Sequence, residues 1–290
     1  MSANTAKLRM TAAMFIFGTI GLFVRWIPLP SSVIALARGT IGMAFLLLVM
    51  AVKKEPISRE ALRKNLLWLL VSGVLLGFNW ILLFESYRYT SVAISTLCYY
   101  MAPILIILSS PIVLRERLTA RKFLCVLAAL CGMVCISGVL SEGIPSAGEL
   151  KGILLGLAAA VLYAAIVLCN KRIHAISAYE KTVFQLGTSA LTMLPYCLLT
   201  VAPEALSFEA QSLLMLLLVG ILHTGVTYYL YFGSMEFLPA QSVAVISYVD
   251  PVVAVLASVL ILREPMGLLE GIGAVLILGA AAASEFEKKE

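Results

Sequence analysis

The sequence predicts an all-α integral membrane protein, with ten transmembrane helices arranged as two inverted five-helix repeats around a central cavity. Composition, ten apolar segments and an internal repeat support this prediction. Hydrophobic residues make up 61% of the 290-residue chain, charged residues 13%, and the mean hydropathy is +1.01. A soluble domain of this length could not bury so much apolar surface, so we expect the chain to lie in a lipid bilayer.

Ten apolar segments are separated by short connections that contain Pro, Gly or charged residues. The segments lie near residues 9–27, 32–52, 65–86, 91–114, 120–138, 152–171, 181–201, 210–233, 240–262 and 266–284. No connection is long enough for a soluble domain, so we expect residues 1–290 to form a single transmembrane domain. The six cysteines fall inside these segments without CxxC spacing, and we interpret them as packing residues.

The distribution of basic residues predicts the orientation. If the N-terminus is cytoplasmic, sixteen Lys and Arg residues lie on the inner side, four lie on the outer side, and Arg38 lies within a segment. This bias predicts that both termini are cytoplasmic. The net charge of +5 follows from the same bias and does not indicate nucleic-acid binding. Because no targeting extension is present, we expect a bacterial inner membrane.

An internal repeat relates residues 1–140 to residues 150–290. A shift of 148 residues aligns Pro103 with Pro251, and Leu114-Arg115-Glu116 with Leu262-Arg263-Glu264. The same shift aligns Gly77 with Gly225, Phe84 with Phe232, Ser86 with Ser234, Tyr100 with Tyr248, and Ser110 with Ser258. Five segments per half is an odd number, so the halves should insert with opposite orientations. Inverted repeats that meet at a midplane site are typical of alternating-access carriers.

Through the paired prolines and the paired Leu-Arg-Glu motifs, the chain resembles the EamA branch of the drug/metabolite transporter superfamily. The resemblance covers nearly the whole chain and is strongest in the fourth and ninth segments. It implies a ten-helix carrier whose central cavity is lined by segments 1, 3, 4, 6, 8 and 9. It also implies a substrate that is a small metabolite, an amino acid or an organic cation.

Asp250 is the first candidate for the substrate site. It is the one charged residue in the 240–262 segment, and it lies near the middle of that segment. A carboxylate at the bilayer midplane costs roughly 2.5–3.5 kcal/mol on insertion scales. Pro251 and Pro103 should break their helices, and Pro251 should free a carbonyl near the charge. We expect Asp250 to hold a cationic substrate group, a proton, or both in competition. The alternative is a structural carboxylate that bonds the freed backbone or pairs with a basic residue.

His223 belongs to a polar stripe at helical spacing in the eighth segment. The stripe consists of Gly220, His223, Thr227, Tyr231 and Ser234. His223 could relay protons or bond substrate, and the alternative is a neutral imidazole held by a neighbouring helix. His174 and His223 are the two histidines, and neither has a partner at metal-ligand spacing. We therefore expect no metal site and no cofactor.

Polar and aromatic residues complete the predicted substrate site. Asn79 and Trp80 align with Thr227 and Tyr228 in the repeat. The residues expected to bind substrate, beside Asp250 and His223, are Asn79, Trp80, Tyr99, Tyr163, Thr227 and Tyr231. Aromatic faces with one carboxylate suit an ammonium group, with about 0.5–2 kcal/mol for each cation–π contact. The alternative is that most of these rings only pack between helices.

Arg38 could clamp a substrate carboxylate, which together with Asp250 would make a site for a zwitterion such as an amino acid. An amine or quaternary ammonium substrate would need Asp250 and the aromatic residues only. The alternative for Arg38 is a snorkelling or interhelical side chain that fixes helix ends. Its counterpart in the repeat is Gln185.

These features favour a secondary active carrier of a small organic solute that moves it by alternating access, with Asp250 and His223 as the candidates for proton coupling. A channel-like facilitator is the first alternative, although no ring of like charges or filter-like glycine run is present. A membrane-embedded enzyme is the second, and the lack of a metal-ligand cluster or nucleophile–base spacing argues against it. We expect no enzymatic activity, a small-molecule substrate and the lipid bilayer as partners, and a monomer or homodimer.

Overall fold

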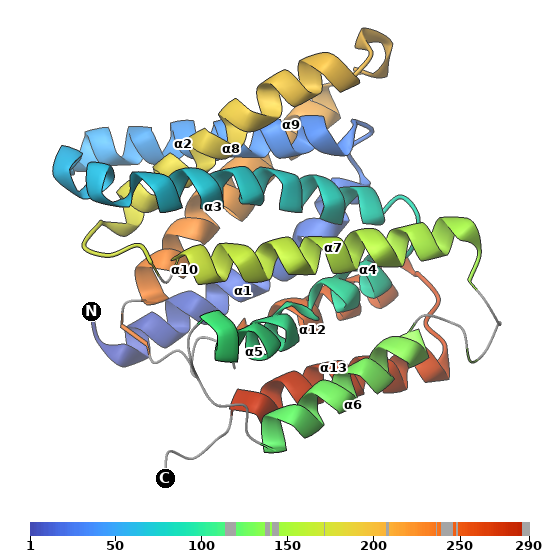
Figure 1. Ribbon diagram of the computed structural model, residues 1–290. Coiled ribbons are helices and arrows are strands. Elements are labelled where there is room, and N and C mark those ends of the chain that lie inside the picture. The colour runs from blue at the N-terminus through green and yellow to red at the C-terminus, as the bar shows by residue number, and fades with distance from the viewer. Residues whose placement is uncertain are drawn as a thin grey trace.

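A computed structural model describes most of the chain as a bundle of helices (Figure 1). It describes residues 1–113, 120–136, 140, 145–170, 172–206, 209–235, 237–238, 246–247 and 249–285. Every regular element within these residues is helical. The long helices run side by side, and α1 begins at the same end of the bundle at which α13 finishes.

The helices follow the apolar segments closely. Their bounds are α1 Ala3–Arg25, α2 Ser31–Lys53, α3 Arg59–Ser86, α4 Val92–Tyr99, α5 Ala102–Val113, α6 Ala120–Ile136, α7 Ala147–Asn170, α8 Ala178–Thr200, η1 Pro203–Ala205, α9 Ala210–Gly220, η2 Ile221–Val226, α10 Thr227–Met235, α12 Val249–Ala257, η3 Ser258–Leu262 and α13 Leu268–Glu285. The short η1 is a 3₁₀ turn, whereas η2 and η3 are π-helical turns that continue the helices before them.

Local capping explains several of the helix starts. The hydroxyl oxygens of Ser58 and Ser91 each accept a hydrogen bond from a backbone N–H in the first turn of α3 and α4. Ser177 and Glu180 form a reciprocal capping box at the start of α8. Such caps satisfy the backbone donors that a helix start leaves without a partner. At the other end of a helix, Lys54 closes α2 in the left-handed conformation with φ 56°.

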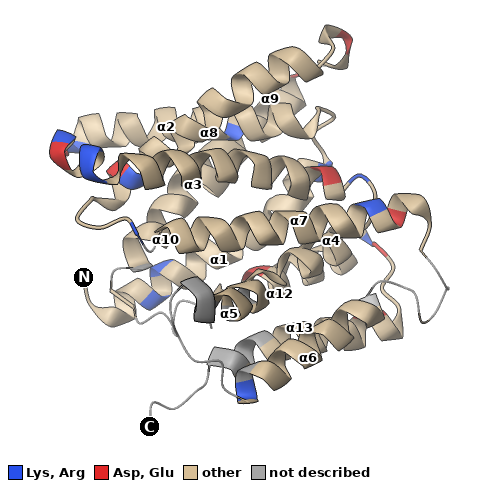
Figure 2. Ribbon diagram, viewed as in Figure 1, with Lys and Arg blue, Asp and Glu red and all other residues tan. Residues whose placement is uncertain are grey.

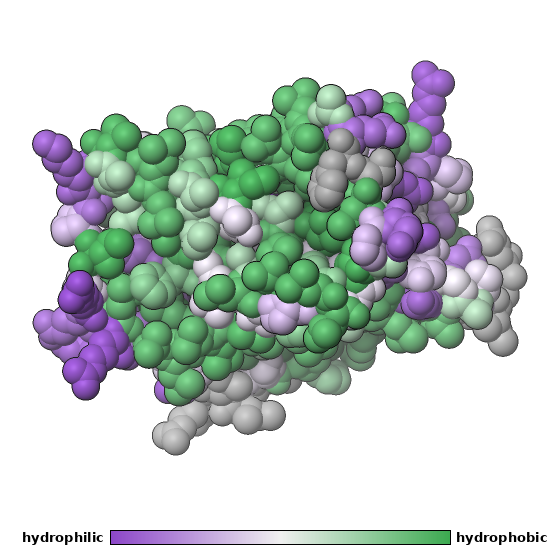
Figure 3. Space-filling view, turned by 90° about the horizontal axis from the view of Figure 1, so that it is seen from above, coloured by the Kyte–Doolittle hydropathy of each residue, from purple (hydrophilic) through white to green (hydrophobic). Residues whose placement is uncertain are grey.

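Six helices in the described residues are long and apolar enough to cross a membrane: α1, α2, α3, α7, α8 and the run from Ala210 to Ser234. Four shorter apolar helices lie in the remaining predicted segments, at Val92–Ile106, Phe123–Cys135, Val249–Leu262 and Leu268–Ala280. The face shown in Figure 3 is apolar across its middle, and hydrophilic residues gather at its two ends. Lys, Arg, Asp and Glu likewise lie mostly at these ends (Figure 2).

Contacts made by a helix of one half correspond to contacts made by the helix that the sequence repeat aligns with it in the other half. α1 packs against α10 and α12, whereas α7, its counterpart in the second half, packs against α3, α4 and α5. α2 packs against its counterpart α8, and α6 packs against its counterpart α13. The helices of the two halves therefore pack against one another and do not form two separate bundles.

The helix of the fourth segment is interrupted just before Pro103, whereas the described residues of the ninth segment are helical on both sides of Pro251. In the fourth segment the helix is interrupted at Tyr100 and Met101, and Pro103 lies in the first turn of α5. A proline in a first turn removes an N–H that has no intrahelical partner anyway, so Pro103 begins a helix. Pro251 instead follows helical residues, since both 246–247 and 249–257 are helical, and it has no N–H to offer the carbonyl four residues earlier. The carbonyl four residues before Pro251, that of Ser247, accepts a hydrogen bond from the Tyr100 hydroxyl at 3.4 Å.

Replacing Gly18 with Ala should destabilise the protein, because α1 touches the backbone of α12 at this glycine. A Cβ atom on Gly18 would lie 2.5 Å from the Asp250 carbonyl oxygen and 2.6 Å from Val253 Cβ. Overpacking of this kind costs about 1–3 kcal/mol. Thermal unfolding in detergent should show a lower Tm.

Gly279→Ala in α13 is the matched control, because a Cβ there would meet nothing within 4 Å. That variant should unfold at the wild-type temperature or slightly above it, since Ala favours helices over Gly by about 1 kcal/mol. Equal Tm changes in the two variants would contradict the close contact between α1 and α12.

Candidate functional site

The candidate site lies where α1, α3, α4, α7, α10 and α12 meet. Asp250 is partly buried in the first turn of α12, and its backbone carbonyl faces Gly18 of α1. Its side chain interacts with the Tyr100 hydroxyl. Within the described part of the chain, no basic residue forms an ion pair with Asp250. The carboxyl group thus has a hydroxyl partner there but no countercharge.

An aromatic cluster lies beside Asp250, and we define it as Phe17, Trp80, Tyr99, Tyr100, Tyr163, Tyr228 and Tyr231. The rings of Tyr99 and Tyr163, the pair favoured by the sequence, have centroids 5.3 Å apart. The hydroxyls of Tyr163 and Tyr231 lie 3.2 Å apart, and Phe17 makes edge contacts with Tyr228 and Tyr231. Four members, Tyr99, Tyr100, Tyr228 and Tyr231, lie near enough to Asp250 for a charge on its carboxyl group to be felt there.

Trp80 and Tyr228, which align in the repeat, touch each other across the two halves. The indole Nε1–H of Trp80 donates to the Tyr228 hydroxyl at 3.3 Å, and the ring centroids are 6.0 Å apart. Residues related by a two-fold operation can meet only close to its axis. If the halves are so related, the aromatic cluster lies at that axis.

Asn79 and Thr227, the two polar residues predicted to bind substrate with the aromatic rings, both form hydrogen bonds within the protein. Asn79 is 1% exposed, and its side-chain amide donates to the Ala159 carbonyl on α7 at 2.7 Å. Its carbonyl oxygen accepts a long bond of 3.5 Å from the Tyr99 hydroxyl, so Asn79 also orients that ring. Thr227 is fully buried and donates to the Leu222 carbonyl of its own helix at 2.6 Å.

His223 lies in the π-helical turn η2 and is 1% exposed. Its Nε2 and the Thr19 hydroxyl are 3.0 Å apart, and its ring packs at 4.8 Å from that of Phe23. Both partners are on α1, so His223 joins α1 to the eighth segment. Nδ1 is buried without a hydrogen-bond partner among the described residues. These contacts match the interpretation of an imidazole held by a neighbouring helix.

Arg38 is buried on α2, with 2% exposure, so the snorkelling interpretation is wrong. The guanidinium stacks on Trp80 at 4.0 Å from the ring centroid. Its Nε donates to the Thr224 hydroxyl of η2 at 3.0 Å, which is the interhelical contact considered above. Arg38 thus reaches the aromatic cluster from the side of α2.

Sequence reasoning missed Thr224 and Thr19, the partners of Arg38 and His223. A stripe at spacing of 3.6 residues assumes an unbroken α-helix, whereas the π-helical turn adds a residue to one turn and changes which side chains face α2. The sequence carried no signal for that extra residue. The described residues also contain no cluster of three or more His, Cys, Asp or Glu that could hold a metal ion.

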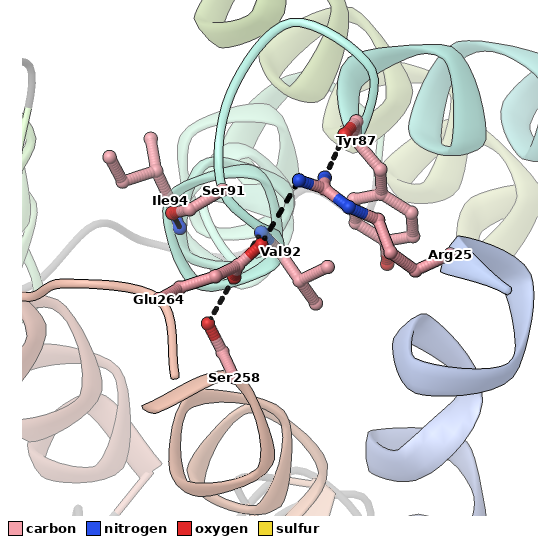
Figure 4. A network of polar contacts seen from close by, with 7 residues as sticks. All are labelled: Arg25, Tyr87, Ser91, Val92, Ile94, Ser258 and Glu264. Carbon is pink, nitrogen blue, oxygen red and sulfur yellow. Dashed lines mark hydrogen bonds and ion pairs between the residues drawn. The ribbon is translucent and has the colours of Figure 1, made fainter. Parts of the chain in front are cut away.

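A polar network joins three parts of the chain at the end of the bundle opposite the start of α1 (Figure 4). Arg25, the last residue of α1, forms an ion pair with Glu264 at 3.4 Å and donates to the Tyr87 carbonyl. Glu264 also accepts from the Val92 N–H at 3.0 Å and from the Ser258 hydroxyl. A single carboxylate therefore connects the end of α1, the start of α4 and the start of η3.

Comparison with known proteins decides the family. The sequence profile of the EamA-like transporter family matches residues 6–138 and, separately, residues 150–284. Together these stretches cover most of the chain. The chain belongs to the EamA-like transporter family. It is accordingly a multi-pass membrane transporter.

Relatives of this EamA-family transporter carry transporter names. One from Bacillus subtilis, "Uncharacterized transporter YxxF", is 30% identical over 281 residues, covering 96% of this chain and 89% of the relative. Another, "Aromatic amino acid exporter YddG" from Ancylobacter novellus, is 28% identical and covers 75% of each chain. A solved crystal structure superposes with a TM-score of 0.69 over 96% of both chains at 22% identity, a likeness that concerns the fold alone.

In this EamA-family transporter, Glu264→Ala should destabilise the fold more than Arg25→Ala does. Removing the carboxylate leaves the Val92 N–H and the Ser258 hydroxyl without their acceptor, at a cost of about 2 kcal/mol or more. Arg25 has a side chain 42% exposed, so losing its ion pair should cost under about 1 kcal/mol.

Thermal unfolding in detergent checks this order, and Glu264→Gln, which keeps an acceptor oxygen, should fall between the two. An Arg25→Ala variant as unstable as Glu264→Ala would mean that the ion pair, rather than the two hydrogen bonds, holds this end together.

Proposed function

We propose that this EamA-family protein is a secondary active transporter that moves a small organic solute by alternating access, with Asp250 as its central charge. The observation that carries the proposal is a carboxyl group inside an apolar bundle, next to Tyr100 of the aromatic cluster and without a countercharge among the described residues. Ionisable groups in such positions mark substrate or proton pathways.

The proposed architecture is a single transmembrane domain of ten helices in two inverted repeats around a central site. Three observations support it: the family profile matches each half separately, the helix pairs match under the repeat, and Trp80 touches its counterpart Tyr228. Close approaches match as well. A Cβ on Gly77 would lie 2.9 Å from Ser189 Oγ of α8, and one on Gly225 would lie 3.4 Å from the Gly42 carbonyl of α2.

Asp250 and the aromatic cluster suit the cationic group of an amine or amino acid. The carboxylate supplies the opposite charge, and the tyrosine and tryptophan faces attract an ammonium group through their quadrupoles. A proton can neutralise the same carboxyl group, so proton and substrate would compete for it, which is a simple basis for coupled exchange. The aromatic amino acid exporter among the relatives is consistent with a substrate of this kind.

The other substrate contacts we propose come from Trp80, Tyr99, Tyr163 and Tyr231, with Asn79 orienting Tyr99. His223 and Thr227 would act by holding the eighth segment rather than by touching substrate, because their partners are Thr19 and the Leu222 carbonyl. In the cell, we propose a bacterial inner-membrane location, both termini in the cytoplasm, and a monomer or homodimer. The network around Glu264 then lies on the outer side.

The proposal predicts that substrate binding strengthens as the pH rises and that Asp250→Asn abolishes this dependence. Because a proton and the cationic group of the substrate compete for the carboxylate, raising the pH removes the competing proton. Binding of phenethylamine, choline, phenylalanine, leucine and lysine to purified protein, measured by thermal shift at several pH values, tests this. The control is Glu60→Gln, which removes an exposed carboxylate paired only with Lys64.

Ligands that stabilise wild type and Asp250→Asn equally at every pH would show that Asp250 has no part in substrate binding. Transport in proteoliposomes then separates a carrier from a channel. Initial rates should saturate with solute concentration, whereas rates that rise linearly without limit would favour the channel.

A short cross-link between positions 25 and 264 should arrest transport if the Glu264 network has to open in each cycle. Arg25→Cys and Glu264→Cys are combined in a background without the six native cysteines and treated with a short bifunctional thiol reagent. Solute exchange in proteoliposomes should stop. Cross-linking Glu60→Cys to Lys64→Cys within α3 is the control and should leave exchange unchanged. Full exchange after complete cross-linking at 25 and 264 would exclude a moving gate there.

A further inference from the structure

Arg38 is a buried cation that the described residues leave without an anionic partner. None of the described ion pairs includes it. Its neighbours are aromatic and neutral: the rings of Trp80 at 4.0 Å and Phe84 at 5.3 Å, the Thr224 hydroxyl and the His223 carbonyl. Cation–π contacts and neutral hydrogen bonds offset only part of the cost of burying a charge. The guanidinium is therefore disposed to take an anion.

The hydrogen bonds of Arg38 leave part of its donor edge unused. Nε donates to Thr224 Oγ1 at 3.0 Å, and Nη2 makes a long bond of 3.5 Å to the His223 carbonyl. The described residues place no acceptor on Nη1. A guanidinium presents its donors in a planar fork that matches the two oxygens of a carboxylate. The free part of that fork is suited to an acid group of a ligand.

The π-helical turn η2 fixes the position of the guanidinium through Thr224. The Thr224 hydroxyl donates to the Val219 carbonyl, five residues earlier, at 2.9 Å. Its oxygen is thereby left to accept from Arg38 Nε. Thr224 is fully buried, and a Cβ on Gly42 of α2 would lie 2.8 Å from its Cγ2, so η2 packs directly on α2. The hydroxyl has little room to turn away from Arg38.

Arg38 and Asp250 are linked through the aromatic cluster. Arg38 stacks on Trp80, and Trp80 bonds Tyr228. Tyr228 contacts Phe17, the neighbour of Gly18, at which α1 meets the Asp250 backbone. The cation and the carboxyl group are not paired with each other, since no ion pair joins them. Part of the aromatic cluster thus lies near one positive and one negative group, an arrangement that matches a ligand carrying both charges.

We infer that Arg38 is a subsite for the carboxylate of a zwitterionic substrate, and that Thr224 is the residue that positions it. The inference rests on the proposed carrier function, because Asp250 and the aromatic cluster would hold the amine and side chain of the same molecule. The ligand class is a solute with an amine and a carboxylate on one carbon frame, distinct from a simple amine.

The experiment compares amino acids with the amines that lack their carboxylate. Phenylalanine with phenethylamine, leucine with isopentylamine, and lysine with cadaverine are titrated into purified protein by calorimetry. Wild type should bind at least one amino acid tighter than its amine. Thr224→Val, which keeps the shape and removes the hydroxyl, should reduce that preference about tenfold, as expected for one hydrogen bond to a charged group. Thr224→Ser should retain it.

Thr227→Val is the matched control, because Thr227 is also buried and also bonds the carbonyl five residues before it, but the hydroxyl it loses has no bond to Arg38. It should keep the wild-type preference. A Thr224→Val variant with a lower Tm and an unchanged preference would reduce Thr224 to a structural role and overturn the inference.

The outcomes also separate this inference from the proposed function. Amines that bind wild type as tightly as their amino acids, with binding lost in Asp250→Asn, would remove Arg38 as a carboxylate subsite and leave the carrier proposal standing. If none of the six compounds binds, both the zwitterion subsite and the proposed role of Asp250 are contradicted.

Discussion

Inside a bilayer, each polar group has to find its partner within the protein, and this constraint shapes the whole bundle. Thr224, Thr227 and Ser234 donate their hydroxyls to carbonyls of their own helical run, and the Asn79 amide reaches the Ala159 carbonyl on the facing helix. The side chains that depart from this rule are informative. Asp250 and Arg38 are ionisable groups in the interior without an opposite charge among the described residues, and the proposed substrate site is built on these two.

The family and the site answer different questions. Membership of the EamA-like family accounts for apolar helices, the duplicated half and a transporter's general activity. It does not select a solute, because relatives with the same bundle can differ at a few interior side chains. Selectivity has to come from the geometry around Asp250, Arg38 and the tyrosines between them. This is the usual relation between a widely used fold and the sites placed on it.

Much of the helical layout could be predicted from the sequence, because apolar length and the repeat are properties of the chain alone. The repeat even aligned Trp80 with Tyr228, which prove to be in contact. Hydrophobic patterning could not predict η2, because a π-helical turn depends on how α2 packs against it at Gly42 and Arg38. For the same reason Thr224 was overlooked, while His223 was noticed for its residue type. The Leu114-Arg115-Glu116 motif lies outside the described residues. A structural role is therefore described only for its counterpart, Leu262-Arg263-Glu264, through the bonds of Glu264.

The hydrogen bond from the Tyr100 hydroxyl to the Ser247 carbonyl joins the interruption of the fourth segment to the helical backbone before Pro251 in the ninth. At 3.4 Å it is long for a hydroxyl bond, so its net contribution is at most about 1 kcal/mol, less than twice the thermal energy of roughly 0.6 kcal/mol. Random motion alone breaks and remakes a link of that strength continually. The bond therefore adds little to the packing that holds α4 against α12, and in the proposed carrier it is a contact that a movement of these helices would break at little cost.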